Sequence, residues 1–174
     1  MAAEQWIRQG QAAYPRAPVI ANTSGNLFIR MGEYAQARQA FLDALQSVQE
    51  MRPGLRYVLL NNIAYADTLL ADPSLLAEAD EYSLMAYKNA PWEPSVVGTR
   101  GVALVALGRV DEGVALLKKA MATHTDVESK ALDACHLALA ERSRGNVAEG
   151  TRYWHAARQL DPRCRLLAQE TAGF

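Results

Sequence analysis

Apolar residues occupy most positions between residues 96 and 107, and beyond them the pattern acquires a polar side. The first segment, VVGTRGVALVAL, presents apolar side chains on nearly all sides, which is typical of a helix packed by neighbours on two faces. Gly108 and Arg109 interrupt the segment, and Asp111 and Glu112 follow, where negative charge favours a helix start. Apolar residues then recur at helical spacing, at Val114, Leu116, Leu117, Ala120 and Met121. The stretch therefore predicts two helices that fold back on each other.

Each of these two predicted helices contains an internal glycine, Gly101 in the first and Gly113 in the second. A glycine inside a helix costs roughly 1 kcal/mol relative to alanine. Such a cost usually has a packing reason, so we expect the two helices to approach each other closely at these glycines.

The same arrangement recurs along the chain, at residues 18–51, 57–93, 94–127 and 131–164. Small and aromatic residues mark the repeats, with glycine or polar turns between the helices: Gly25, Phe28, Gly32, Ala37, Phe41 and Ala44; Ala64, Tyr65, Ala79, Ser83 and Ala86; Ala138, Gly145, Gly150, Trp154 and Ala157. The turn at residues 71–75 is about three residues longer than its counterparts. A period of roughly 34 residues built from two helices is a sequence signature of solenoids.

These residues resemble the pattern of the tetratricopeptide repeat (TPR) family, in the small–aromatic–small spacing, the turn and the terminal proline. The resemblance implies an all-α fold, a right-handed superhelical solenoid of helix–turn–helix repeats, with residues 1–174 as a single domain. Two departures concern Gly113 and Gly150, which stand where the family prefers alanine. The large aromatic residue expected early in each first helix is also missing.

Both ends of the chain are expected to be incomplete or irregular repeats. Residues 1–15 have the spacing of a second helix, which predicts a half-repeat. We interpret it as a capping helix or, preferably, as the start of a fragment cut from a longer protein, because MAAEQW lacks the polar face of a solenoid cap. Residues 165–174 form a tail whose Leu166 and Leu167 could cover the last hairpin. The stretch TDVE at residues 125–128 predicts a capping box.

Composition narrows the function classes. The net charge of −1 provides no global field for nucleic acid, and no apolar run is long enough to insert into a membrane. The two cysteines are too few for a disulfide framework and suit a reducing compartment, so a cytoplasmic protein is expected. The excess of arginine over lysine and the abundance of alanine indicate a bacterial source.

Candidate chemistry is sparse. No glycine-rich loop follows a strand pattern, which argues against a nucleotide cradle. Cys135 and His136 are adjacent and point about 100° apart on a helix, whereas a zinc site needs three or four converging ligands. Trp154 occupies a core position, which removes it as a stacking platform for nucleic-acid bases. We therefore expect no catalysis, no cofactor, no metal and no nucleic-acid partner.

The resemblance implies that the first helices of the repeats line a concave groove that takes a peptide or helix from a protein partner. The matching positions are Asn22, Asn26, Arg30, Asn61, Tyr65, Thr68, Val102, Cys135, Leu139 and Arg142. Asparagine amides donate and accept at once, and so suit the backbone of an extended peptide. The alternative, that these amides are solvated or bridge the repeats, stays open. A non-catalytic protein–protein interaction module is the leading interpretation.

Two other interpretations remain. The segments NNIAYAD and DPSLLAEAD resemble soluble repeat tails of bacterial membrane proteins, including intramembrane metallopeptidases, which suggests a regulatory or scaffold domain of a larger protein. Residues 67–93 are rich in acidic side chains and residues 142–165 in arginine, which suggests self-association between chains in a structural assembly.

Overall fold

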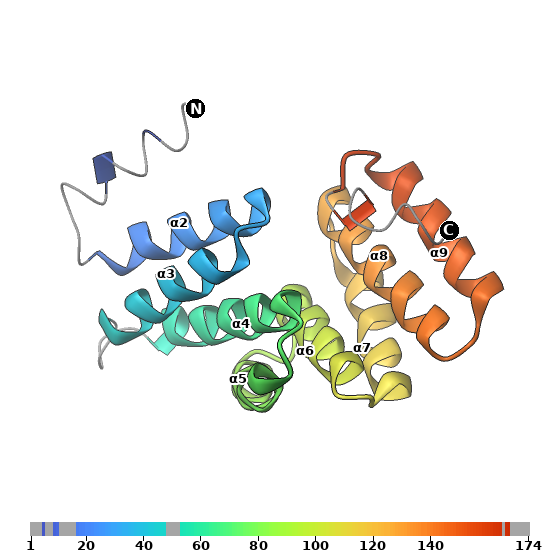
Figure 1. Cartoon of the computed structure of the whole chain (residues 1–174), viewed down its shortest axis with the longest axis horizontal. Helices are drawn as coiled ribbons and strands as arrows, with labels where there is room; N and C mark the ends of the chain where they lie inside the picture. The colour runs from blue at the N-terminus through green and yellow to red at the C-terminus, as the bar shows by residue number, and fades with distance from the viewer. Residues whose placement is uncertain (1–4, 6–8, 11–16, 48–52, 165, 168–174) are drawn as a thin grey trace. The chain divides into compact units, whose positions relative to one another are not determined.

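The computed structural model describes residues 5, 9–10, 17–47, 53–164 and 166–167, and every regular element among them is helical (Figure 1). Most of the predicted half-repeat and tail lies outside these residues. The elements are α2 (Pro18–Met31), α3 (Tyr34–Ser47), α4 (Pro53–Leu70), a 3₁₀ turn η1 (Pro73–Leu75), α5 (Leu76–Asn89), α6 (Pro94–Ala106), α7 (Val110–Thr123), α8 (Val127–Ser143) and α9 (Val147–Leu160). Helices that follow each other pack in pairs, so the prediction of an all-α fold of helical hairpins is confirmed.

The chain divides into two compact units, residues 1–89 and residues 90–174. The first unit contains the hairpins α2–α3 and α4–α5, and the second contains α6–α7 and α8–α9. Within each unit the hairpins are joined by contact between the second helix of one and the first helix of the next, namely α3 with α4 and α7 with α8. One helix pair falls in each predicted repeat range, although α4 and α8 begin before residues 57 and 131.

The first helix of each hairpin is followed by a residue whose backbone adopts the left-handed conformation. Gly32, Gly108 and Gly145 have φ values of 81°, 78° and 85°, a conformation that glycine adopts without steric cost. After α4 the same role falls to Ala71, with a φ of 52°. Asp72 then accepts a hydrogen bond from the backbone N–H of Ser74 at 2.9 Å, which starts η1 and accounts for the longer turn predicted there.

The start of α8 differs from the predicted capping box. Asp126, not Thr125, is the capping residue, and its Oδ1 accepts a hydrogen bond from the backbone N–H of Ser129 at 2.7 Å. Aspartate is among the preferred capping residues, and its charge also interacts favourably with the helix dipole. The predicted boundary was therefore one residue too early.

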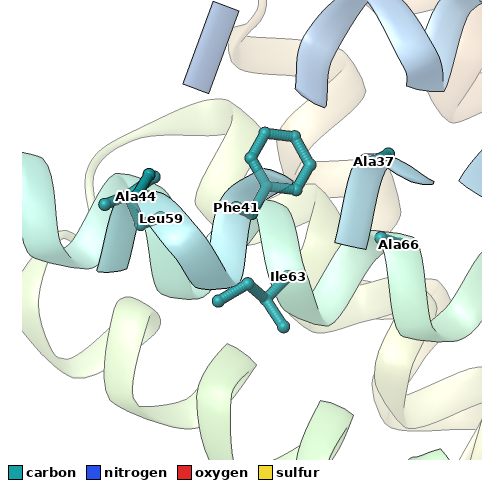
Figure 2. Packing of buried hydrophobic residues seen from close by; sticks show 6 residues of the cluster. All are labelled: Ala37, Phe41, Ala44, Leu59, Ile63 and Ala66. Atoms are coloured by element: carbon teal, nitrogen blue, oxygen red, sulfur yellow. The ribbon is translucent and has the colours of Figure 1, made fainter. Parts of the chain in front are cut away.

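The core of the first unit lies between α3 and α4 (Figure 2). Phe41 is fully buried at its centre, and alanines and branched aliphatic residues surround it: Ala37, Ala44, Leu59, Ile63 and Ala66. On α2, a Cβ atom added to Gly25 would lie 2.3 Å from the Phe41 ring. The small residue of the repeat pattern therefore makes room for the aromatic residue of the same hairpin.

The second unit has an equivalent core between α7 and α8, built on Leu117 and Leu137. Val102 and Val105 of α6 and Tyr153 of α9 pack against it. Trp154 is 5% exposed, so its predicted core position is confirmed. α6 and α7 meet at Gly101 and Gly113, as the internal glycines predicted.

Candidate functional site

A chain of side-chain amides links two helices of the first unit. Asn62 on α4 donates from Nδ2 to Oδ1 of Asn22 on α2 at 2.9 Å. Asn61 in turn donates from Nδ2 to Oδ1 of Asn62 at 3.3 Å. The structure thus brings together two of the predicted groove residues, Asn22 and Asn61, through a third asparagine. We call Asn22, Asn61 and Asn62 the amide cluster.

Asn62 is the member of the cluster that sequence reasoning missed. It follows Asn61 directly, and neighbouring residues of a helix point about 100° apart. The repeat pattern assigned the groove position to Asn61, but Asn61 is only 7% exposed and its Oδ1 is buried without a hydrogen-bond partner among the described residues. Asn62 is half-buried. The signal available in the sequence was the Asn-Asn pair itself, which suits a bridge from α4 to α2.

The remaining predicted residues of the first unit are arranged around the cluster. Asn26 and Arg30 are exposed and follow Asn22 at intervals of four residues, so all three lie along one side of α2. Tyr65 and Thr68 continue α4 and are half-buried. The Thr68 hydroxyl donates to the backbone carbonyl of Tyr65 at 2.7 Å. This bond occupies the hydroxyl proton and leaves the Thr68 side chain bound to its own helix.

The predicted residues of the second unit do not form a comparable polar cluster. Val102 packs against the core of that unit. The stem of Arg142 lies over Gly150, since its Cγ is 2.7 Å from where a Cβ of that glycine would be. Leu139 is half-buried. Cys135 is fully buried, with its Sγ 3.7 Å from that of Cys164.

An ion network lies farther along α4. Arg38 of α3 donates from Nε to Oδ1 of Asp67 at 2.6 Å and also pairs with Glu78 of α5. Asp67 is fully buried, and burial raises its pKa to about 6 despite the opposing effect of Arg38. This network joins three helices of the first unit and has a structural role.

A second buried carboxyl, Asp133, lies between α8 and α6. Its Oδ1 is 3.0 Å from where a Cβ of Gly98 would be, and its Oδ2 lies 3.5 Å from Nε2 of His124. Burial, together with the nearby charge of Asp126, raises the pKa of Asp133 to about 8. Burial likewise lowers the pKa of His124. The neutral forms of both groups are therefore favoured near neutral pH.

At least two of the six arginines at residues 142–165 form ion pairs within the chain. Arg144 donates to Glu141 at 2.7 Å and also pairs with Asp111, and Arg152 pairs with Glu149. Burial acts to raise the pKa of Glu141, but hydrogen bonds from Asn146 and Arg144 lower it overall. These pairs reduce the charge that this stretch offers to another chain.

The described residues include neither a membrane-spanning helix nor a cluster of metal ligands. None of the described helices is long and apolar enough to cross a membrane. Within the same residues, no three His, Cys, Asp or Glu side chains form a group that could hold a metal ion.

Comparison with known proteins identifies a solved structure with a similar fold. No protein-family model and no curated protein matches the sequence. Among solved structures, the chain is similar to the crystal structure of YrrB, a TPR protein with an unusual peptide-binding site. The similarity has a TM-score of 0.55 at 16% sequence identity, and it covers 96% of this chain and 80% of that chain. The chain therefore has the fold of the tetratricopeptide repeat proteins, as the residue pattern of its hairpins predicted.

Proposed function

We propose that this chain is a non-catalytic protein-interaction module, and that the amide cluster with Asn26 binds the backbone of an extended peptide. The observation that carries the proposal is the hydrogen bond from Asn62 Nδ2 to Asn22 Oδ1. The fold it shares with YrrB, described as having a peptide-binding site, supports the class of ligand.

The bond between Asn62 and Asn22 fixes the orientation of an amide before any ligand arrives. Since the Asn22 oxygen accepts from Asn62, the NH₂ group of Asn22, the other branch of the same planar amide, points away from that bond. Asn22 is half-buried and Asn26, one turn later, is exposed. The two side chains together offer donors and acceptors at a spacing set by the helix. A pre-oriented amide loses less conformational entropy on binding than a free one.

The surrounding residues add a cation and an aromatic ring to the proposed site. Arg30 continues the same side of α2 and adds positive charge beside the amides. Tyr65 contributes an aromatic ring on α4, of the kind enriched in binding surfaces. The residues of the second unit are outside the proposed site, because Val102 belongs to its core and the Arg142 stem packs on Gly150. The two free, buried thiols suit a protein that works in the reducing cytoplasm.

The proposal is tested with peptides selected from a random library on the wild-type chain. Affinities are then measured by fluorescence anisotropy for the wild type, Asn22→Ala and Asn26→Ala. Loss of a hydrogen bond of about 1 kcal/mol predicts roughly fivefold weaker binding for each variant. N-methylation of single peptide bonds in the ligand should also weaken binding, because it removes a backbone donor.

Asn89→Ala is the matched control, since Asn89 is an exposed asparagine of the same unit whose Nδ2 bonds to its own helix at Met85. It should bind as tightly as the wild type. Equal affinity of Asn22→Ala, Asn26→Ala and the control for every selected peptide would refute the proposed site. Circular dichroism of each variant checks that the helices are retained.

Self-association is the second candidate function, favoured by the unequal distribution of acidic and basic residues along the chain. Light scattering at low and high salt measures it. A mass that rises with concentration and falls with salt would support assembly, whereas a monomer at all conditions would exclude it. The intramolecular pairs of Arg144 and Arg152 lead us to expect the monomer.

A further inference from the structure

The two cysteines of the chain lie side by side although 29 residues separate them in sequence. Cys135 is in the middle of α8, and Cys164 follows the end of α9. Their sulfur atoms are 3.7 Å apart, and the residues are 0% and 8% exposed. A disulfide has an S–S distance of about 2.05 Å, so the two sulfurs must approach each other further before a covalent bond can form.

The chain after α9 is folded so that Cys164 faces α8. The Cys164 N–H donates to the carbonyl of Asp161 at 3.1 Å, and the Leu167 N–H donates to the carbonyl of Cys164 at 3.0 Å. Leu166 and Leu167 are 5% and 6% exposed, so the turn is anchored by apolar burial.

The two thiols are not equivalent. The contact with Cys135 lowers the pKa of Cys164, and the backbone N–H groups of Leu166 and Leu167 also favour its thiolate. The same contact, together with burial, raises the pKa of Cys135. The adjacent backbone N–H groups and the slight exposure of Cys164 favour it as the attacking thiol, which leaves the fully buried Cys135 as its partner. This asymmetry is that of an attacking and a resolving cysteine.

We propose that Cys135 and Cys164 form a redox-active pair that a hydroperoxide closes to an intramolecular disulfide. The Cys164 thiolate attacks one oxygen of hydrogen peroxide, so that an S–O bond forms, the O–O bond breaks and the second oxygen leaves as water after taking a proton. Cys135 then gives up its proton and attacks the sulfur of the Cys164 sulfenic acid. The S–S bond forms, the S–O bond breaks and a second water leaves. Two thiols have been oxidised and one peroxide reduced.

Closure of this bond would change how the end of the chain is held. In the dithiol form, the contact of Cys164 with α8 is the non-covalent one between the two sulfurs, beside the buried Leu166 and Leu167. In the disulfide form Cys164 is tied covalently to the middle of that helix. The loop that the bond closes is long enough for a substantial loss of unfolded-state entropy. Oxidation should therefore stabilise the second unit.

The test treats the reduced full chain with hydrogen peroxide and then denatures it in a thiol-reactive maleimide. The expected product is a monomer that has lost two hydrogen atoms in mass and has no reactive thiol. Its melting temperature should exceed that of the reduced chain by about 5 °C or more. Reduction with dithiothreitol should restore both the two thiols and the original melting temperature.

Single variants separate the two roles. Cys135→Ser should accumulate a sulfenic acid that dimedone traps, while Cys164→Ser should react much more slowly with peroxide. The wild type under identical treatment should trap little dimedone, because Cys135 resolves the intermediate. Two thiols that remain reactive in the wild type, disulfides only between chains, or equal peroxide reactivity of the two single variants would each overturn the proposal. The wild-type measurement decides the outcome even if a variant fails to fold.

Discussion

Gly101 and Gly113 face each other across α6 and α7 so closely that a Cβ atom on Gly113 would lie 2.6 Å from the carbonyl oxygen of Gly101. The same atom would be 2.6 Å from Cγ2 of Val105, and a Cβ on Gly101 would be 2.9 Å from Cγ of Leu117. The backbones of the two helices are therefore in direct contact. A glycine inside a helix loses conformational entropy on folding, and at these two positions that cost accompanies the close approach of α6 and α7.

Gly113→Ala should lower the free energy of unfolding by about 2 kcal/mol, although alanine has the higher helix propensity. The added methyl group must push α6 away, because backbone atoms of Gly101 and Val105 stand in its path as well as the Val105 side chain. Gly101→Leu should unfold the α6–α7 hairpin altogether. Urea denaturation followed by circular dichroism measures both effects.

Gly54→Ala is the control for Gly113→Ala, since nothing lies within 4 Å of the position of its Cβ. It should leave stability unchanged or raise it by up to about 1 kcal/mol. If Gly113→Ala were as stable as this control, the close approach of α6 and α7 would not be a determinant of stability.

Arg38→Met should destabilise the first unit by about 3 kcal/mol, because it leaves the buried Asp67 carboxylate without its cation. The double variant Arg38→Met, Asp67→Leu should recover most of that loss, since no buried charge then remains. Denaturant titrations of the two variants and of Asp67→Leu give the coupling energy. Arg109→Met serves as the comparison, because Arg109 and its partner Glu112 are 48% and 60% exposed and solvent screens such surface pairs. Equal losses for Arg38→Met and Arg109→Met would contradict the role assigned to the network.

Asp133→Asn should raise the free energy of unfolding relative to the wild type at pH 8, and this gain should shrink as the pH becomes acidic. The folded-state pKa of Asp133 is raised to about 8 from 3.8, so the folded protein binds a proton that the unfolded chain has already lost between these values. The stability of the wild type therefore falls as pH rises through this window, whereas a neutral amide adds no such dependence. The gain at pH 8 should be on the order of 2 kcal/mol.

The pH test compares unfolding free energies at pH 4, 6 and 8 for the wild type, Asp133→Asn and Asp43→Asn. Asp43 is an exposed carboxyl on α3 and should show no comparable gain. A difference between Asp133→Asn and the wild type that does not grow with pH would show that burial does not govern this group.

The sequence was sufficient for the hairpins because their determinants are local. Spacing of small and apolar residues located the helices, and Gly32, Gly108 and Gly145 marked the turns that require a left-handed residue. The predicted contact of Gly101 with α7 followed from the cost of glycine in a helix. None of these inferences needed knowledge of residues far away in the chain.

The details of the candidate site depend on contacts between elements, which spacing does not specify. The repeat pattern selected Asn61, but the orientation of α4 against α2 makes Asn62 the residue that reaches Asn22. Cys135 was assigned to the groove, whereas the turn after α9 buries it against Cys164. In the sequence, nothing distinguishes Asp67 and Asp133 from exposed acidic residues. Both are buried because neighbouring helices pack over them.

Packing between successive helices has a consequence for how the chain is made. In the first unit, contacts join α2 to α3, α3 to α4 and α4 to α5. In the second unit, they join α6 to α7, α7 to α8 and α8 to α9. Such short sequence separations allow rapid folding, because little loop entropy is lost before contacts form. Each hairpin can therefore assemble as it emerges from the ribosome, and within each unit the second hairpin can pack on the first.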